Sequence, residues 1–257
     1  MLSSFIDSLL LVLGFPCLED APAGPAGAFA EYAVALADTV AKREGLSAEQ
    51  LVGLPLAGLT SYQALFTGAG RDFTGAELGK VAAGHKLLVL GGAAATGAIA
   101  IQLAKAAGAH VTTTASPNKM PDGTSKIDYM KKLGADEVIN YKEKDWSEAL
   151  AGKDYDQIYD CVGDAEDWKK AAKVLKKGGL FVSIANFGDA KSTDSHTFKN
   201  FLLKSNSEDL SKMVQMVKEG KLNIPVDSIV PFADVPSVLT KSMGWASAGK
   251  LVVKVSE

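Results

Sequence analysis

Cysteine and histidine are scarce in this sequence of 257 residues. The cysteines are Cys17 and Cys161, and the histidines, His85, His110 and His196, are scattered along the chain. A structural zinc ion takes about four such ligands and a catalytic one about three, usually clustered. This inventory argues against a zinc site, and it excludes a disulfide framework. Since no histidine is near Cys161 in the sequence, we expect this residue to be small and buried rather than a nucleophile.

Arginine is also scarce, and positive charge is not in excess. Arg43 and Arg71 are the only arginines, and the formal net charge is −3. Dedicated nucleic-acid binders carry a basic patch or a basic balance, so we expect no nucleic-acid partner. A site for a phosphate group would use lysine rather than the two-pronged guanidinium of arginine.

A long apolar run is missing as well. Near the N-terminus, Leu9–Leu13 is too short to span a bilayer, and Asp7 interrupts the apolar segment. A secretory signal carries Lys or Arg before its apolar core, and none precedes this one. We therefore expect residues 1–16 to belong to the fold, or to be a degraded start to it, in a cytoplasmic protein with no membrane partner.

The remaining composition is that of a globular protein, with 47% hydrophobic residues in one large domain or two modest ones. Apolar and β-branched runs predict strands at Phe29–Leu36, Leu87–Leu90, His110–Thr114, Val138–Tyr141, Gln157–Cys161, Leu180–Ala185 and Lys250–Val255. Helical patterns that end at glycines predict helices at Ala98–Ala107, Trp168–Leu175 (before Gly178-Gly179) and Glu208–Lys218. Residues 59–66 have helical spacing, and Ser47 with Gln50 forms a capping box. The alternation of strand and helix predicts a parallel sheet covered on both faces.

The most informative segment is Lys86–Ala115, in which a strand, a glycine turn, a helix and a second strand follow one another. Gly92, Ala94 and Gly97 occupy the glycine positions of the G-x-G-x-x-G fingerprint. Free N–H groups and the helix dipole make such a turn an anion site, and in a βαβ unit the anion is usually a dinucleotide pyrophosphate. The pattern alone fits a structural turn without a ligand equally well.

Several segments follow one another in an order and spacing typical of one family. They are GAFAEYAV (Gly27–Val34), LPLAGLTSYQALF (Leu54–Phe66), GHKLLVLGGAAATGAIAIQLAK (Gly84–Lys105), LGADEVINY (Leu133–Tyr141), DCVG (Asp160–Gly163) and GKLVVKV (Gly249–Val255). Together they resemble the medium-chain dehydrogenase/reductase superfamily, in its zinc-free quinone oxidoreductase and enoyl/alkenal reductase branch.

The resemblance implies an α/β fold, with a Rossmann-type doubly wound parallel sheet and a partial GroES-like β domain. It assigns residues 1–60 to the partial GroES-like catalytic domain, 61–218 to an NADP-binding Rossmann domain and 219–257 to a return to the catalytic domain. The family's N-terminal strands are absent before Gly14. The substrate pocket is then open, or another subunit closes it, or the chain derives from a truncated gene model. A homodimer is expected, since a truncated domain should leave apolar surface.

The resemblance also implies the residues that bind the cofactor. Those expected at the pyrophosphate are Gly92, Ala93, Ala94, Ala95, Thr96 and Gly97. Those expected near the adenosine ribose are Ser116, Lys119, Lys126 and Tyr141, and those expected elsewhere along the cofactor are Thr60, Val162, Gly163, Phe187 and Lys250. For many of these, ordinary packing or a solvated lysine is the alternative. An acidic residue after the second strand would repel a 2′-phosphate, and Ser116 stands there instead, which favours NADPH.

Two features depart from the family pattern. Ala94 and Ala95 stand where the family has two glycines, and alanine is tolerated there if φ is negative. Residues 120–125 look inserted after the second strand. Without zinc, nothing polarises an alcohol strongly, so we expect hydride transfer to a quinone or to an α,β-unsaturated carbonyl. No catalytic acid is assigned, although Tyr32 and Tyr62 are candidates by type. The alternative is a catalytically impaired NADPH-binding or scaffolding relative that has lost part of its substrate domain.

Overall fold

A computed structural model of the chain describes residues 35–68, 70, 78, 81–120, 122–186, 188, 191–244 and 247–255, and the backbone of residues 9–10. Cys17, Tyr32, Phe187 and most of the strand expected at Phe29–Leu36 lie outside these residues. The chain divides into two compact units. One comprises Met1–Leu59 with Ser205–Glu257, and the other comprises Thr60–Lys204.

The second unit is built on a six-stranded sheet in which every neighbouring pair is parallel. Its strands are β3 (Lys86–Leu90), β4 (His110–Ala115), β5 (Glu137–Asn140), β6 (Tyr155–Asp160), β7 (Leu175–Ser183) and β8 (Thr197–Asn200). Their order is β5-β4-β3-β6-β7-β8, so the direction of winding reverses between β3 and β6. This is the doubly wound Rossmann order, and the predicted fold class is confirmed.

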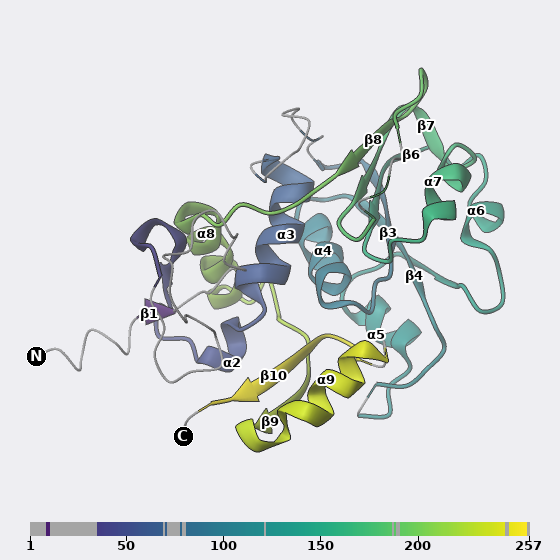
Figure 1. Ribbon diagram of the computed structural model, residues 1–257. Helices are drawn as coiled ribbons and strands as arrows, with labels where there is room; N and C mark the ends of the chain where they lie inside the picture. Colours follow the sequence, from purple (N-terminus) through teal and green to yellow (C-terminus); the bar gives the residue numbers. More distant parts are fainter. Residues whose placement is uncertain are drawn as a thin grey trace, which may run out of the picture. The chain divides into compact units, whose positions relative to one another are not determined.

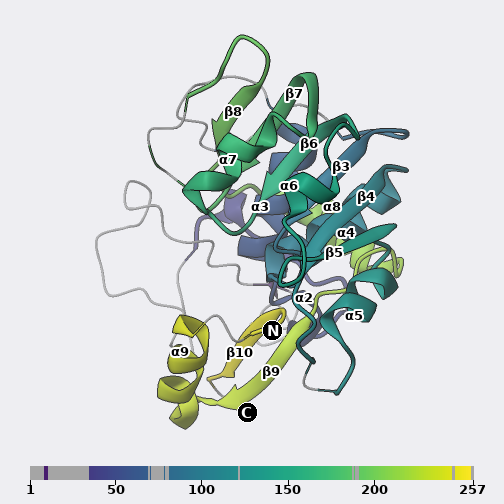
Figure 2. The same ribbon diagram turned by 90° about the vertical axis from the view of Figure 1, so that its right-hand side faces the viewer.

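Helices cover both faces of the sheet, as the continuous apolar run of β3 requires. Helix α4 (Ala95–Ala106) lies on one face, while α6 (Trp146–Ala149) and α7 (Ala165–Ala171) lie on the other (Figures 1 and 2). Leu88 and Leu90 belong to the core cluster that contains α6 and α7 residues. Side chains alternate along a strand, so the equally buried Leu87 and Val89 face α4.

Two sequence predictions are wrong in this unit. The helix expected at Trp168–Leu175 is α7, which begins at Ala165 because the side chain of Asp164 accepts a hydrogen bond from the Glu166 N–H at 2.9 Å. It ends at Ala171, and the expected stop, Gly178-Gly179, lies inside β7. The pairing of β7 with β6 changes register there, and Gly178 has a φ of +80°. The glycines therefore mark an irregularity in a strand rather than the end of a helix. The predicted strands of the sheet are confirmed, although β7 begins at Leu175 rather than at the predicted Leu180.

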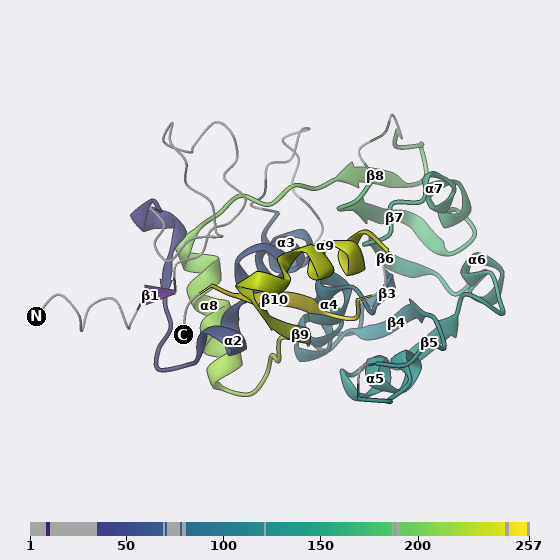
Figure 3. The ribbon, with the colours of Figure 1, turned by 60° about the horizontal axis from the view of Figure 1, so that its bottom comes forward.

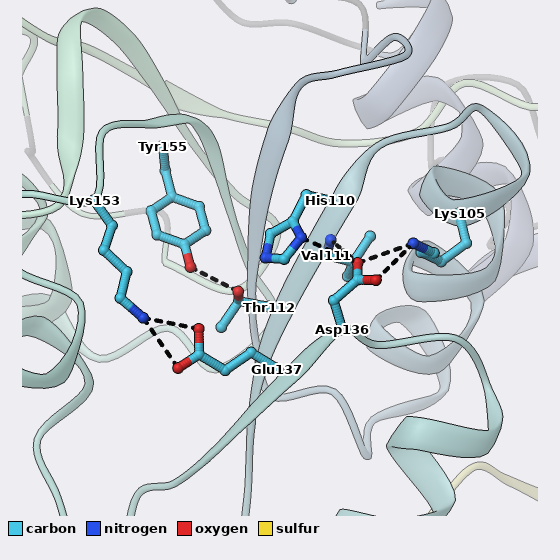
Figure 4. A network of polar contacts seen from close by, with 8 residues as sticks. All are labelled: Lys105, His110, Val111, Thr112, Asp136, Glu137, Lys153 and Tyr155. Carbon is cyan, nitrogen blue, oxygen red and sulfur yellow. Dashed lines mark hydrogen bonds and ion pairs between the residues drawn. The ribbon is translucent and has the colours of Figure 1, made fainter.

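Polar contacts join the amino ends of neighbouring strands (Figure 4). Asp136, just before β5, accepts hydrogen bonds from the Val111 N–H of β4 at 2.7 Å and from Lys105 Nζ of α4 at 2.9 Å. Two more contacts link β4, β5 and the start of β6: Lys153 Nζ donates to Glu137 at 2.9 Å, and the Tyr155 hydroxyl donates to Thr112 Oγ1 at 2.6 Å. These contacts hold the amino ends of the strands together. The carboxyl ends, at the opposite edge of the sheet, are the ones available to a ligand.

The first unit holds short elements from both ends of the chain. They are β1 (Leu9–Leu10), η1 (Ala37–Thr39), β2 (Ala41–Lys42), α2 (Ala48–Leu51), η2 (Leu54–Gly58), α8 (Ser207–Lys218), β9 (Val226–Pro231), η4 (Phe232–Asp234), α9 (Val235–Met243) and β10 (Lys250–Lys254). Strands β1 and β2 pair antiparallel, and β9 and β10 pair in parallel with α9 packed against both (Figure 3). The capping box before α2 is confirmed, since Ser47 and Gln50 exchange hydrogen bonds at 2.8 and 3.2 Å.

Two further short helices complete the connection between the units along the chain. They are α3 (Leu59–Tyr62) and η3 (Gln63–Thr67), which continue η2 without a break. The helix expected at residues 59–66 is thus confirmed. The two short α-helices between β4 and β6 are α5 (Lys126–Lys132) and α6, and α5 packs against β4 and β5.

Candidate functional site

The turn between β3 and α4, residues 91–97, is called here the glycine turn. It begins with Gly91, whose φ of +83° suits glycine alone. The Gly91 N–H donates to Thr114 Oγ1 at 2.9 Å, and the Gly92 N–H donates to the Thr114 carbonyl at 3.1 Å. Both bonds fasten the glycine turn to the end of the neighbouring strand β4.

Two positions in the glycine turn have no room for a side chain. A Cβ at Gly92 would lie 2.2 Å from Thr113 Oγ1, and a Cβ at Gly97 would lie 2.3 Å from the Gly91 carbonyl oxygen. Both distances are far below van der Waals contact. Gly97 therefore permits the close approach of α4 to the end of β3, which is the role of the last glycine in the dinucleotide fingerprint.

The N-terminus of α4 offers backbone donors to a ligand. Among the described residues, no side chain caps the helix at Ala94, and its first turn contains no acidic residue. The first N–H groups of a helix have no partner within the helix, and the dipole makes this end positive. Ala94 has a φ of −65°, so the alanine in place of the family's middle glycine causes no backbone strain. The residues present therefore fit a pyrophosphate.

The threonines of β4 were missed as part of this site. Thr113 Oγ1 donates to the Val89 carbonyl at 2.8 Å, and Thr114 Oγ1 accepts from Gly91. Thr112 Oγ1 accepts from the Tyr155 hydroxyl. A run of hydroxyl side chains in a buried strand was a usable signal, because buried polar groups need partners, and the last two of the run, Thr113 and Thr114, lie beside the glycine turn.

Ser116 and Tyr141 lie at the same edge, just after β4 and β5. Ser116 is buried, and the Tyr141 side chain is 48% exposed. The Tyr141 N–H donates to the Ala115 carbonyl at 3.4 Å, which places the two strand ends side by side. Lys142 Nζ lies 5.3 Å from the centre of the Tyr141 ring, so the ring already has a cation over one face.

Lys119 and Lys126 flank the segment that looked inserted. Lys119 forms a β-bridge with Ser125, and the Lys126 N–H donates to the Asn118 carbonyl at 2.8 Å. The segment thus folds back on itself, and its ends meet. Lys119 is exposed, whereas Lys126 is the first residue of α5 and is largely buried.

The loop after β6 carries two more of the residues expected at the cofactor, Val162 and Gly163. Asp160 is fully buried, and its Oδ1 accepts hydrogen bonds from the N–H groups of Val162 at 2.8 Å and Gly163 at 3.1 Å. Val162 lies beside the glycine turn, because a Cβ at Gly91 would be 2.9 Å from Val162 Cγ2. These residues therefore meet the glycine turn at the point where the winding of the sheet reverses, the usual ligand position in such sheets.

Thr60 is buried in α3, next to a residue that contacts the glycine turn. Ser61 Oγ donates to the Thr96 carbonyl at 2.9 Å and lies 3.2 Å from the Tyr159 hydroxyl. Burial raises the pKa of the neighbouring Cys161 thiol to about 12. The expectation that Cys161 is a buried residue rather than a nucleophile agrees with that environment.

Two further expected residues stay predictions. Phe187 lies outside the described residues. Lys250 belongs to the other compact unit, where its N–H donates to the Pro225 carbonyl at 2.7 Å and burial lowers the pKa of its side chain. Its role toward the cofactor stays a prediction.

The described part of the chain contains neither a candidate metal site nor a candidate membrane span. There, no group of three or more His, Cys, Asp or Glu side chains is arranged to hold a metal ion. No helix among the same residues is both long and apolar enough to cross a membrane.

Comparison with known proteins places these features in a family. Residues 133–253 match the family model described as zinc-binding dehydrogenase. The chain is 33% identical over 239 residues to a chloroplast envelope quinone oxidoreductase homolog of Arabidopsis thaliana, covering 89% of this chain and 69% of that protein. It is 32% identical over 245 residues to an NADPH-dependent alkenal/one oxidoreductase of the same plant, covering 91% of this chain and 55% of that one.

A solved structure agrees with the sequence matches. The quinone oxidoreductase from Coxiella burnetii superposes with a TM-score of 0.78 at 32% identity, over 95% of this chain and 70% of that one. The similarity therefore extends through both compact units and is not confined to the sheet.

Proposed function

This chain belongs to the medium-chain dehydrogenase/reductase superfamily, in the branch of quinone oxidoreductases and alkenal reductases, and we propose that it transfers a hydride from NADPH to a quinone or an α,β-unsaturated carbonyl without zinc. The observation that carries the proposal is the uncapped N-terminus of α4 behind a turn that only glycine can form at Gly92 and Gly97. It combines the backbone donors of an anion site with the shape that a dinucleotide requires.

Each part of the carboxyl edge has a role in this proposal. The glycine turn holds the pyrophosphate through the free N–H groups of the first turn of α4. Val162 and Gly163, kept in place by Asp160, lie where the nicotinamide half of the cofactor would rest. When bound, NADPH supplies the hydride, and solvent supplies the proton that completes the reduction.

The preference for NADPH rests on the end of β4. An acidic residue there would bind the ribose hydroxyls of NADH and repel a 2′-phosphate, and Ser116 stands in its place. Lys119 and Lys126 lie at the two joined ends of the next loop and supply positive charge. Lysine acts on a phosphate as a point charge, so this pair needs no fixed two-pronged geometry.

The proposed acceptor is supported by the scarcity of metal ligands in the chain and by the relatives. No metal-binding cluster was found among the residues that the structure describes. Quinones and activated alkenes accept a hydride without the Lewis acid that an alcohol dehydrogenase requires. One relative is named as a quinone oxidoreductase homolog and another as an alkenal/one oxidoreductase, so both kinds of acceptor occur in the names of relatives.

The proposal is tested by steady-state turnover of the purified chain with NADPH or NADH and a panel of quinones and 2-alkenals. We expect turnover with at least one acceptor and a clear preference for NADPH. Ser116→Asp should lower kcat/KM for NADPH about tenfold or more, because like charges then face each other across the site. Ser116→Asn, which adds a side chain of the same size at the same buried position without the charge, is the matched control and should lower kcat/KM much less.

Three outcomes can be told apart. Turnover that Ser116→Asp lowers supports the proposal. Saturable binding of NADPH without turnover of any acceptor would favour the non-catalytic alternative. Absence of binding to either nucleotide would refute the cofactor assignment itself.

A dimer is proposed separately, supported by exposed apolar side chains in the first unit. Phe232, Leu239 and Met243 are 47, 51 and 74% exposed, and an exposed apolar patch commonly marks an interface. Sedimentation equilibrium tests this point, and a monomer at all accessible concentrations would contradict it.

A further inference from the structure

The carboxylate of Asp160 is buried at the end of β6, and both of its oxygens are used. Oδ1 accepts hydrogen bonds from the N–H groups of Val162 and Gly163, in the loop that follows β6. Oδ2 accepts a hydrogen bond from Ser183 Oγ at 2.7 Å. A buried carboxylate is costly unless its oxygens are satisfied, and these contacts satisfy it.

Ser183 is the last residue of β7 and stands opposite Asp160 in the parallel pairing. It is fully buried. Its Oγ accepts hydrogen bonds from the N–H groups of Asn186 at 2.9 Å and Ala185 at 3.3 Å, in the loop that follows β7. One serine therefore connects the carboxylate of β6 to the backbone of the next loop.

The two loops also touch each other directly. Gly163 has a φ of +83°, and a Cβ there would lie 2.8 Å from the Ala185 carbonyl oxygen. A displacement of either loop would therefore move the other. The glycine turn, by contrast, is fastened to β4 through Thr114, so it has its own support.

We propose that Asp160 and Ser183 form a positioning pair that holds these two loops in register for the nicotinamide half of NADPH. The inference rests on the proposed function for the ligand, and on the hydrogen bonds above for the mechanism. Neither side chain touches the reacting atoms, so both are positioning residues. Because Thr114 also fastens the glycine turn to β4, loss of the pair should affect the nicotinamide half of the cofactor more than the adenosine half.

A second serine–aspartate pair, in which the serine is buried and the aspartate is exposed, provides a control for the loss of a buried serine hydroxyl. Ser147 Oγ donates to Asp145 Oδ1 at 2.6 Å, and Ser147 is 1% exposed. This pair caps α6, and its hydrogen bonds in the described structure join it to α6 and to Lys170 of α7 rather than to the two loops. Ser147→Ala removes the same group from an equally buried site, so it reports what the loss of such a hydroxyl does to the fold alone.

The experiment compares Ser183→Ala, Asp160→Asn and Ser147→Ala with the wild-type protein. Binding of NADPH and of adenosine 2′,5′-bisphosphate, which lacks the nicotinamide, is titrated for each. Ser183→Ala should weaken NADPH about tenfold, equivalent to about 1.4 kcal/mol, and change the bisphosphate by less than about twofold. Asp160→Asn keeps Oδ1 as an acceptor and should show a smaller effect of the same kind. Ser147→Ala should alter neither ligand.

Amide hydrogen exchange without ligand gives a second readout that is independent of the cofactor. Ser183→Ala should speed exchange at Ala185 and Asn186, whose N–H groups lose their acceptor, and Ser147→Ala should not. Equal weakening of both ligands, or no change in exchange, would overturn the inference while leaving the proposed function standing. Wild-type protein that binds neither ligand would overturn the proposed function and the inference together.

Discussion

Replacing Gly97 with alanine would push a methyl group into the backbone of the glycine turn. The added Cβ would lie 2.3 Å from the Gly91 carbonyl oxygen, 2.9 Å from Gly92 Cα and 3.0 Å from the Gly91 carbonyl carbon. All three atoms belong to the main chain, so no side chain can rotate away to relieve the contact. Either the glycine turn opens or α4 moves outward.

The cost of this substitution follows from two opposing terms. Overpacking a well-packed site typically costs about 1–3 kcal/mol. Alanine within a helix is preferred over glycine by about 1 kcal/mol, which offsets part of that cost. Because all three contacts are with main-chain atoms, the overpacking cost lies at the upper end of its range, so the net loss in free energy of unfolding should be about 2 kcal/mol, which lowers Tm by about 4–8 °C in a protein of this size. A shift of about 1 Å in positioning groups can cost about a hundredfold, so NADPH affinity should fall by about tenfold or more.

Thermal unfolding and an NADPH fluorescence titration measure both effects in the same preparation. Gly244→Ala is the matched control. Gly244 has a φ of −78°, and an added Cβ there would come no closer than 3.5 Å to another atom. We expect this control to retain the wild-type Tm and affinity. If Gly97→Ala also retains both, then the close approach of α4 to β3 is not what shapes the site.

Three further predictions concern single side chains. Ala94→Ser should cap α4 and raise the free energy of unfolding by about 1 kcal/mol, yet weaken NADPH, because the new hydroxyl occupies an N–H meant for the phosphate; tighter binding would contradict this. Burial alone would raise the pKa of Asp136, but bonds from Val111 and Lys105 hold it below 3.8. The contribution of the Asp136 carboxylate to the free energy of unfolding is therefore present above about pH 5 and is lost as the pH falls through the lowered pKa. In urea titrations at acid pH, the wild type and Asp136→Asn should approach the same free energy of unfolding. Burial raises the pKa of Asp167 to about 6 despite the hydrogen bond from the Trp146 indole. The free energy of unfolding that the neutral Asp167 contributes is fully present below about pH 4 and is lost as the pH rises through 6. Asp167→Asn should therefore be more stable than the wild type above that pH. The tryptophan fluorescence of the wild type should titrate near pH 6, and that of Asp167→Asn should not.

The βαβ unit at the centre of the sheet was predictable, because the local sequence pattern there favours the same structure that packing in the sheet requires. The apolar run of β3, the glycines after it and the stop at Gly108 all describe one buried βαβ unit, and Gly108 has the expected positive φ of +81°. Gly178 and Gly179 were misread because a positive φ serves a helix end and a strand irregularity equally well. Only the pairing of β7 with β6 decides between the two, and pairing is not a local property.

The site was predictable in its main chain but not in its supporting side chains. Glycine spacing points to a turn, because the backbone conformation of that turn depends on residues next to one another. Asp160 and Ser183 are 23 positions apart, and their bond exists only because β6 and β7 lie in register. The bond from Ser61 to Thr96 likewise joins residues distant in the sequence. Such contacts come from topology, and no spacing rule along the chain foretells them.

The central claim is that this chain passes a hydride from NADPH to its acceptor. The most direct test uses NADPH carrying deuterium at both hydrogens of the reactive nicotinamide carbon, with a 2-alkenal as acceptor, because deuterium on the hydroxyl of a reduced quinone would exchange with water. Mass spectrometry of the saturated aldehyde should find one deuterium, at the β-carbon, because the hydride goes there and the proton comes from solvent. Saturated aldehyde without deuterium, or no reduction of any acceptor by a preparation that binds NADPH, would contradict the account.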